Sequence, residues 1–147
     1  MRTEPTRPLN TVDALVQLSF LIQRVLSEIG AVHNLSVIQI RLLGVLRDRR
    51  PGMLELGSHL GLDKSSMTGL VGRAEKRGLV ERSPSPRDGR AVLVSLTPLG
   101  RQVMQRCGIE VGRRITELTE PLTAAQGAQL TKLAGAIVGV PPQDVDG

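Results

Sequence analysis

The chain has 147 residues, of which 40% are hydrophobic, a net charge of +5 and a single cysteine. This length suits one compact domain, or two small modules that share helices. Cys107 has no second cysteine to pair with, which excludes a disulfide-framed secreted scaffold and makes a reducing cytoplasm the expected setting. Phe20 is the only aromatic residue, so a stacking platform for single-stranded nucleic acid is excluded as well.

The excess positive charge lies in the middle of the chain. Between Arg41 and Arg90 there are eleven Lys or Arg residues against six Asp or Glu, whereas the remaining residues hold eight of each. This distribution is typical of a polyanion-binding module between neutral flanking segments. A basic face that is merely solvated is the simpler alternative.

The first predicted element is a long amphipathic helix, which follows a proline-containing arm over residues 1–9 and a cap at Asn10 or Thr11. Apolar residues recur at helical spacing from Val12 to Ile29, and Gly30 ends the pattern. Charged and amide side chains interrupt this segment, so we expect neither a signal sequence nor a membrane span. Ser36, with Gln39 three residues later, predicts a capping box that opens a second helix with Ile40, Leu43 and Leu46 inward.

Residues 54–78 predict a helix-turn-helix. Leu54, Leu56 and Leu60 predict a short helix that ends at Gly61, and Asp63 caps a second helix that stops at Gly78. The second helix turns Met67, Leu70, Val71 and Ala74 inward. Because only about three residues join the two helices, they must cross steeply, and the small Gly57 permits the close contact.

The outward face of this second helix is polar and basic and has no acidic residue. Hydroxyl groups can bond base edges or phosphates, and the cations of this helix suit backbone phosphates. The candidate DNA contacts on it are Lys64, Ser65, Ser66, Thr68, Arg73, Lys76 and Arg77. A small, polar, solvated surface is the alternative.

Two predicted strands follow, over residues 79–82 and 91–96, with a loop between them that contains Pro84, Pro86 and Gly89. Arg87 and Arg90 would project from the tip of this hairpin, where an arginine can enter a narrow minor groove. Asp88 would hold the Arg90 guanidinium in place or, alternatively, form an Asx turn.

Two helices complete the chain. Thr97 and Pro98 predict a helix start, with Leu99, Cys107 and Leu118 among the apolar residues of one stripe, and Pro121 ends the pattern. Thr123 and Gln126 predict a capping box for a last helix through Val138, before a tail. Cys107 is expected to be buried packing rather than a redox centre.

Taken together, "LGLDKSSMTGLVGRAEKRGLVERSPSPRDGR" and "VSLTPLG" resemble the MarR family of bacterial winged-helix repressors. The resemblance implies a mainly α fold with a small β-hairpin wing, in which a winged helix-turn-helix is flanked by N- and C-terminal dimerisation helices. It implies an arm and dimerisation helix over residues 1–35, a DNA-binding domain over 36–97, and dimerisation helices with a tail over 98–147. Arg90 is then similar to the wing arginine of the minor groove and Asp88 to its positioning partner.

The same resemblance implies a cytoplasmic homodimer that binds a pseudo-palindromic operator in double-stranded DNA and responds to a small aromatic or anionic effector. His33 is a weak candidate for the effector site, although a histidine near a helix end is more often a surface or capping residue. His59 is assigned to packing or phosphate contact. Gly69 and Gly72 depart from the family pattern, which predicts sparse base contacts.

No catalytic group, cofactor motif or metal site can be assembled from the sequence, so an enzyme is not expected. Two alternatives to a sequence-specific regulator remain, namely a non-specific architectural DNA-binding protein and a winged-helix module for protein contact.

Overall fold

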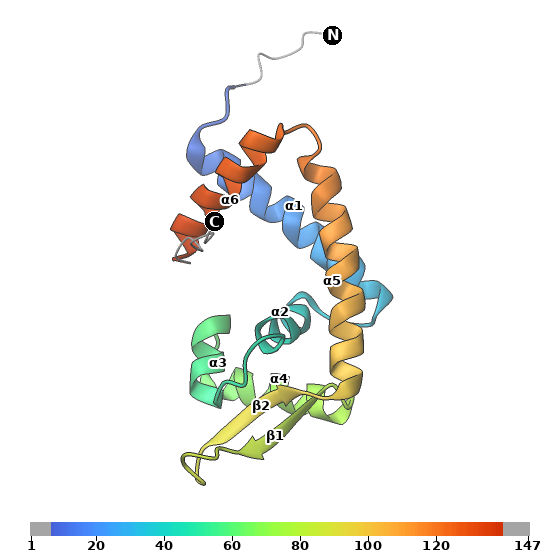
Figure 1. Ribbon diagram of the computed structural model, residues 1–147, viewed down its shortest axis with the longest axis vertical. Coiled ribbons are helices and arrows are strands. Elements are labelled where there is room, and N and C mark those ends of the chain that lie inside the picture. Colours follow the sequence, from blue (N-terminus) through green and yellow to red (C-terminus); the bar gives the residue numbers. More distant parts are fainter. Residues whose placement is uncertain (1–6, 140–147) are drawn as a thin grey trace, which may run out of the picture. The chain divides into compact units, whose positions relative to one another are not determined.

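The computed structural model describes residues 7–139, so the predicted arm before residue 7 and the tail after residue 139 lie outside the described residues. The described chain has six helices and one hairpin in the order α1 (Thr11–Val32), α2 (Val37–Leu46), α3 (Met53–Leu60), α4 (Lys64–Lys76), β1 (Val80–Pro84), β2 (Val92–Leu96), α5 (Pro98–Thr119) and α6 (Ala124–Val138) (Figure 1). It divides into two compact units, residues 1–111 and 112–147, and α5 runs from the first into the second. The predicted mainly α fold with a hairpin wing is confirmed.

The helix starts follow the predicted caps. The side chains of Asn10, Ser36, Asp63 and Thr123 each accept a hydrogen bond from the backbone N–H three residues later. Ser36 and Thr123 complete capping boxes with Gln39 and Gln126. These side chains satisfy donors that the first turn of a helix leaves free, so the helix starts are fixed locally.

The core of the first unit lies among α2, α3, α4 and the hairpin. Leu42, Leu56, Val71 and Val94 are completely buried there, and Met67 and Leu70 of α4 are nearly so. Gly57 lies against α4 as predicted, because a Cβ on it would stand 3.2 Å from Cγ of Met67. Gly61 adopts the left-handed conformation, with φ of 67°, which turns the chain from α3 toward α4.

The hairpin pairs β1 and β2 in antiparallel register from Val80 opposite Leu96 to Pro84 opposite Val92. Pro84 therefore ends β1, and the prediction that it lies in the loop is wrong. A proline fits this position because β1 is an edge strand and needs no donor on its outer side. Gly52 adds a bridge to Leu93 on the other side of β2, a pairing that the sequence did not indicate.

The junction between the hairpin and α5 depends on Gly100. A Cβ on Gly100 would stand 1.9 Å from the carbonyl oxygen of Leu79, so only glycine permits this approach of α5 to the start of β1. Thr97 secures the same junction, since its hydroxyl donates to the carbonyl of Gly78 and accepts from the N–H of Gly100. The predicted start of α5 is confirmed.

The apolar faces of the terminal helices are largely uncovered. In α1 only Val25, Ile29 and Gly30 are buried, and in α6 no residue is. Within residues 7–139, α1 is the one helix long and apolar enough to cross a membrane, judged by length and composition alone, and core helices of soluble proteins meet the same criteria. The expectation that it is not a membrane span therefore stays a prediction.

Two leucines in the first turns of α3 and α5 face solvent. Leu54 is 91% exposed and Leu99 is 49% exposed. In each case a neighbour takes the inward position, Leu56 in α3 and Gly100 in α5. Helical periodicity gave the correct face of each helix only to within about one residue at its first turn.

Candidate nucleic-acid interface

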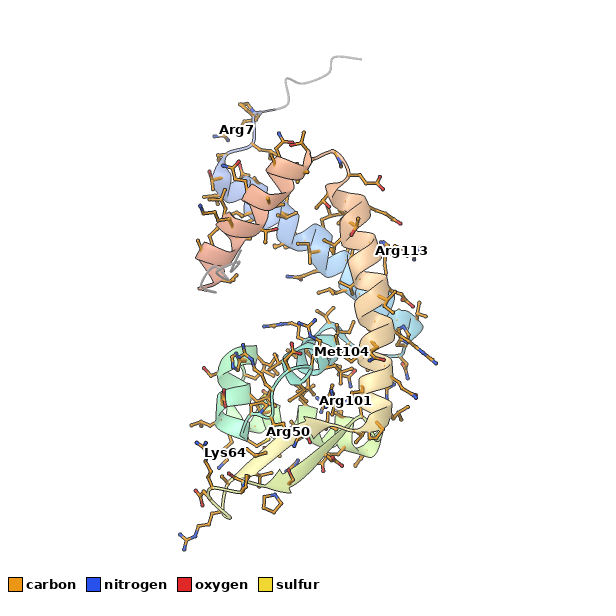
Figure 2. The ribbon with its side chains drawn as sticks, in the orientation of Figure 1. Arg7, Arg50, Lys64, Arg101, Met104 and Arg113 are labelled. Atoms are coloured by element: carbon orange, nitrogen blue, oxygen red, sulfur yellow. The ribbon has the colours of Figure 1, made fainter. Side chains whose placement is uncertain are left out.

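The candidate interface consists of α4 and the β1–β2 hairpin, which we call the wing. The ten side chains that the sequence predicts to contact DNA are all exposed: Lys64, Ser65, Ser66, Thr68, Arg73, Lys76, Arg77, Arg87, Asp88 and Arg90. Lys64 begins α4 and lies at the same end of the first unit as the wing (Figure 2). The opposite side of α4 is buried, so its exposed face is the side available to a partner.

Two of the hydroxyl residues at the start of α4, Ser66 and Thr68, make hydrogen bonds within the helix and its cap. The carboxylate of Asp63 accepts from the N–H of Ser66 at 2.7 Å. Hydrogen bonds from the Ser66 backbone and side chain lower the pKa of Asp63 from its ordinary value of 3.8, so that the cap is charged at neutral pH. The hydroxyl of Thr68 donates back to the carbonyl of Lys64 at 2.9 Å, and its oxygen can still accept.

The one acidic side chain among residues 64–77 is neutralised by the wing. Oε1 of Glu75 lies 2.7 Å from Nε of Arg82, which is in β1. Both side chains are about one-third exposed, so this pair is worth little in stability. Its consequence is electrostatic, because the one carboxylate of α4 is paired with a cation.

Gly69 provides space for Arg73. A Cβ on Gly69 would stand 3.0 Å from Nη1 of Arg73 and 3.8 Å from its Cζ, so the guanidinium lies across the surface of α4 at this glycine. Apart from its chain neighbours and the backbone of α4, no described atom comes within 4 Å of the corresponding position on Gly72. The two glycines that depart from the family pattern therefore differ, and one of them shapes the path of an arginine.

The tip of the wing is an Asx turn. Oδ1 of Asp88 accepts from the backbone N–H of Arg90 at 3.1 Å, and the carbonyl of Asp88 accepts from the N–H of Ala91 at 3.0 Å. Within residues 7–139, no ion pair joins Asp88 to the Arg90 guanidinium. Of the two alternatives for Asp88, the structure has the Asx turn. Asp88 therefore fixes the backbone of Arg90 and not its side chain.

Arg77 is placed differently from the other cations. Its guanidinium donates to the carbonyl of Asn34 at 2.6 Å and to the carbonyl of His33 at 3.1 Å. These carbonyls lie in the segment between α1 and α2, 43 and 44 residues away along the chain. Two of its donors are thus engaged within the protein, which the sequence could not indicate because the partners are backbone atoms.

His33, at the end of α1, and Cys107 of α5 both lie near Glu110. Nε2 of His33 is 3.4 Å from Oε1 of Glu110, an ion-pair distance when the imidazole is protonated. Cys107 is 2% exposed, and burial, together with the nearby Glu110 carboxylate, raises the pKa of its thiol. A raised pKa disfavours the reactive thiolate, which supports the predicted packing role.

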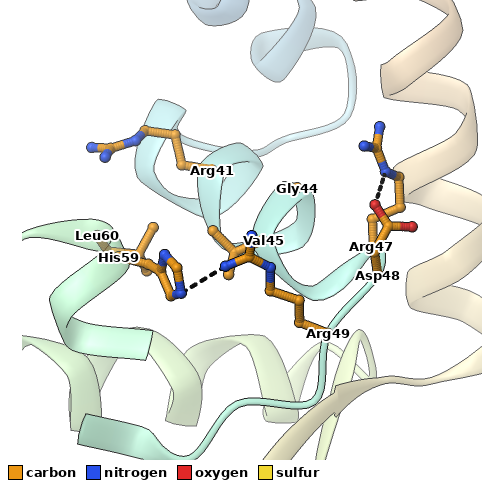
Figure 3. A pocket seen from close by; sticks show the side chains of 8 residues that line it. All are labelled: Arg41, Gly44, Val45, Arg47, Asp48, Arg49, His59 and Leu60. Carbon is orange, nitrogen blue, oxygen red and sulfur yellow. Dashed lines mark hydrogen bonds and ion pairs between the residues drawn. The ribbon is translucent and has the colours of Figure 1, made fainter. Parts of the chain in front are cut away.

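Two cavities of the first unit adjoin α2. One, of about 510 Å³, lies between α1 and α2 and is lined by Ser19, Ile22, Gln23, Leu26, Val37, Ile38 and Arg41. The other, of about 370 Å³, lies between α2 and α3, where Nη1 of Arg49 is 2.8 Å from Nε2 of His59 (Figure 3). His59 also lies 3.8 Å from Glu55, so it packs against side chains of its own unit.

A metal site is not found in the described part of the chain, where no three His, Cys, Asp or Glu side chains are grouped so as to hold an ion.

The fold and this basic surface define a winged helix-turn-helix protein of the DNA-binding type. Residues 33–91 match the sequence profile of the MarR family. The chain is 30% identical over 103 residues to the homoprotocatechuate degradative operon repressor of Escherichia coli, and the match covers 69% of each chain. The chain belongs to the MarR family.

Further similarities agree with this assignment. The multiple antibiotic resistance protein MarR of Salmonella typhimurium is 37% identical over 86 residues, which is 58% of this chain and 60% of that protein. The chain thus spans about three-fifths of the length of this relative. The crystal structure of apo MarR from E. coli superposes with a TM-score of 0.76 at 28% identity, over 90% of this chain and 98% of that one. The homoprotocatechuate operon repressor and the transcriptional repressor IacR of Pseudomonas putida are repressors by name.

Proposed function

We propose that the protein is a sequence-specific transcriptional regulator that binds a pseudo-palindromic operator in double-stranded DNA as a homodimer. The observation that carries the proposal is the joint surface of α4 and the wing, on which ten predicted contacts are exposed while Glu75 is paired with Arg82. A polar helix whose one carboxylate is paired with a cation, beside an arginine-bearing hairpin, suits a major groove and an adjacent minor groove. Repressor names among the relatives favour repression.

Each part of this surface has a proposed role. The hydroxyl groups of α4 and Arg73 face base edges, Lys64 and Lys76 contact phosphates, and Arg87 and Arg90 lie along or in the minor groove. Asp88 acts through the turn that it forms with Arg90. Arg77 is left out of the direct contacts because two backbone carbonyls already occupy its guanidinium.

The proposed homodimer rests on the uncovered helices. Large apolar side chains of α1 such as Leu15 and Phe20 are 47% and 62% exposed, and those of α6 such as Leu133 and Ile137 are 55% and 70% exposed. Apolar surface of this extent is typical of protein interaction sites. We therefore propose dimerisation segments over residues 1–35 and 98–147 around a DNA-binding domain over residues 36–97. A two-fold dimer places its two α4 helices about 34 Å apart, in successive major grooves.

The cavity between α1 and α2 is the proposed effector site. Its volume of about 510 Å³ suits a small organic molecule, its walls are mainly aliphatic, and Arg41 can pair with a carboxylate or phenolate. His33, the weak candidate from the sequence, faces Glu110 instead. These features support the proposal that the protein is cytoplasmic and that a small aromatic or anionic compound regulates it.

Selection of bound fragments from the encoding genome tests the proposal. We expect enrichment of an inverted repeat whose half-site centres lie about one helical turn, roughly 10 base pairs, apart. Affinity for that repeat should exceed affinity for scrambled DNA by at least about a thousandfold. Equal affinity for both would favour an architectural protein, and binding that does not weaken as salt rises would favour a module for protein contact.

A further inference from the structure

We propose that Arg77 is a positioning residue that fixes the C-terminal end of α4 to the segment between α1 and α2, and so sets how α4 meets the bases. This inference rests on the proposed function. In this proposal Arg77 affects DNA binding by fixing the orientation of α4, and it does not contact a phosphate.

The hydrogen bonds of Arg77 have the geometry of a fork. Nη1 donates to Asn34 at 2.6 Å and Nη2 donates to His33 at 3.1 Å, so two nitrogens of one planar group hold two consecutive carbonyls. A guanidinium presents its donors in a fixed plane, and this arrangement restricts both the distance and the angle of whatever it joins. A lysine ammonium at the same place is a point charge and cannot restrict the angle.

Both ends of this connection are held by backbone structure. Arg77 caps α4 and its N–H bonds the carbonyl of Arg73, and Gly78 then turns the chain with φ of 73°. On the other side, Asn34 adopts φ of 56° and is the one described non-glycine residue with positive φ. The N–H of Leu35 bonds the carbonyl of Gly30 at 2.7 Å, which closes this corner onto the end of α1.

The segment that holds Arg77 also faces α5 and begins α2. The side chain of His33 lies 3.4 Å from Glu110 of α5, and Ser36 caps α2 two residues after Asn34. Arg77 therefore joins the end of α4 to the corner between α1 and α2, close to Glu110 of α5. A small rotation of α4 about this end would move the hydroxyl face at its start relative to the base edges.

Salt dependence and base discrimination separate positioning from phosphate contact. A phosphate contact contributes to the slope of log affinity against log salt, and removal of one contact lowers that slope by about one. A positioning residue leaves the slope unchanged but lowers the ratio of specific to non-specific affinity, by about tenfold for the loss of discrimination at roughly one base pair.

The decisive variant is Arg77→Lys, which keeps the charge and removes the fork. We expect it to lower the specificity ratio on the selected operator about tenfold, with the salt slope and the thermal midpoint near those of the wild type. The matched control is Lys76→Gln, at a neighbouring exposed residue, which should lower the slope by about one and keep the ratio. A wild-type ratio in Arg77→Lys, or a lowered slope in Arg77→Gln, overturns the proposal.

Asn34 tests the other end of the same connection. Asn34→Gly keeps the positive φ and the carbonyl position and should behave as the wild type, whereas Asn34→Val strains that conformation and should lower the specificity ratio as Arg77→Lys does. Equal ratios in the two Asn34 variants contradict the proposal. If the wild-type protein itself shows no preference for any sequence, the proposed function fails, and that outcome is separate from a failure of Arg77 alone.

Discussion

The winged helix-turn-helix and the terminal helices bury their apolar residues to very different extents. Leu42, Leu43, Leu56 and Leu70 in the former are at most 1% exposed. In α1 and α6, by contrast, most of the large apolar side chains face outward. The winged helix-turn-helix supplies its own core, whereas the terminal helices have apolar faces that a second chain can cover. DNA recognition and dimerisation should therefore respond to different substitutions.

The largest expected effect follows from a charge on the uncovered face of α1. Phe20→Asp should raise the dimer dissociation constant by at least about a hundredfold, because an unpaired carboxylate would be buried at the interface at a cost of several kcal/mol. Sedimentation equilibrium measures this constant. The matched control is Leu54→Asp, at a leucine that is 91% exposed on α3, which should leave it unchanged. A stable Phe20→Asp dimer would remove α1 from the interface.

The next effect concerns the core of the winged helix-turn-helix. Leu43→Ala should lower the free energy of unfolding by about 2–5 kcal/mol, because it opens a cavity where the side chain is 1% exposed. The measurement is urea denaturation at several protein concentrations. The comparison variant is Leu133→Ala in α6. Its loss of unfolding free energy should depend on the fraction of protein that is dimeric, because Leu133 is proposed to pack against the second chain. Equal, concentration-independent losses in both variants would contradict the division between the two regions.

A third substitution should affect DNA binding and leave the dimer intact. Arg90→Ala removes the guanidinium at the wing tip and should weaken operator binding by about 1–3 kcal/mol. The control is Arg106→Ala on α5, which lies outside the proposed contacts. Titration of labelled operator at low salt measures both variants, and wild-type affinity in Arg90→Ala would exclude this arginine from the interface.

The smallest expected effect is a dependence on pH within α4. The folded-state pKa of Asp63 is lowered, so its contribution to stability is present above the ordinary value of 3.8 and is lost as the pH falls through the folded-state pKa. Asp63→Asn keeps a capping oxygen but does not titrate. The thermal midpoint of the variant should therefore fall less than that of the wild type between neutral pH and pH 3. Parallel curves would contradict a charged cap.

Sequence patterns predicted best those features that depend on residues close together along the chain. The caps at Ser36, Asp63 and Thr123 and the buried side of α4 are confirmed because a hydroxyl or carboxylate three residues from a free N–H suffices to form them. The family assignment is confirmed for the same reason, since its motifs are local. The bridge between Gly52 and Leu93 was missed because it joins residues distant in sequence.

The candidate site was predicted in part. Exposure of all ten residues agrees with the predicted surface, whereas their contacts with DNA remain proposals. The fork of Arg77 could not be predicted, because its acceptors are backbone carbonyls that any residue provides. The position of Arg73 over Gly69 also depends on the folded surface and on no motif.

Stoichiometry on the selected operator tests the central claim most directly. The mass of the complex, measured by sedimentation velocity on a duplex with both half-sites and on one with a single half-site, should give two chains per complete operator and a large loss of affinity on the half-site. One chain per duplex, with equal affinity for the complete operator and the half-site, would contradict a dimeric regulator that reads a two-fold symmetric sequence.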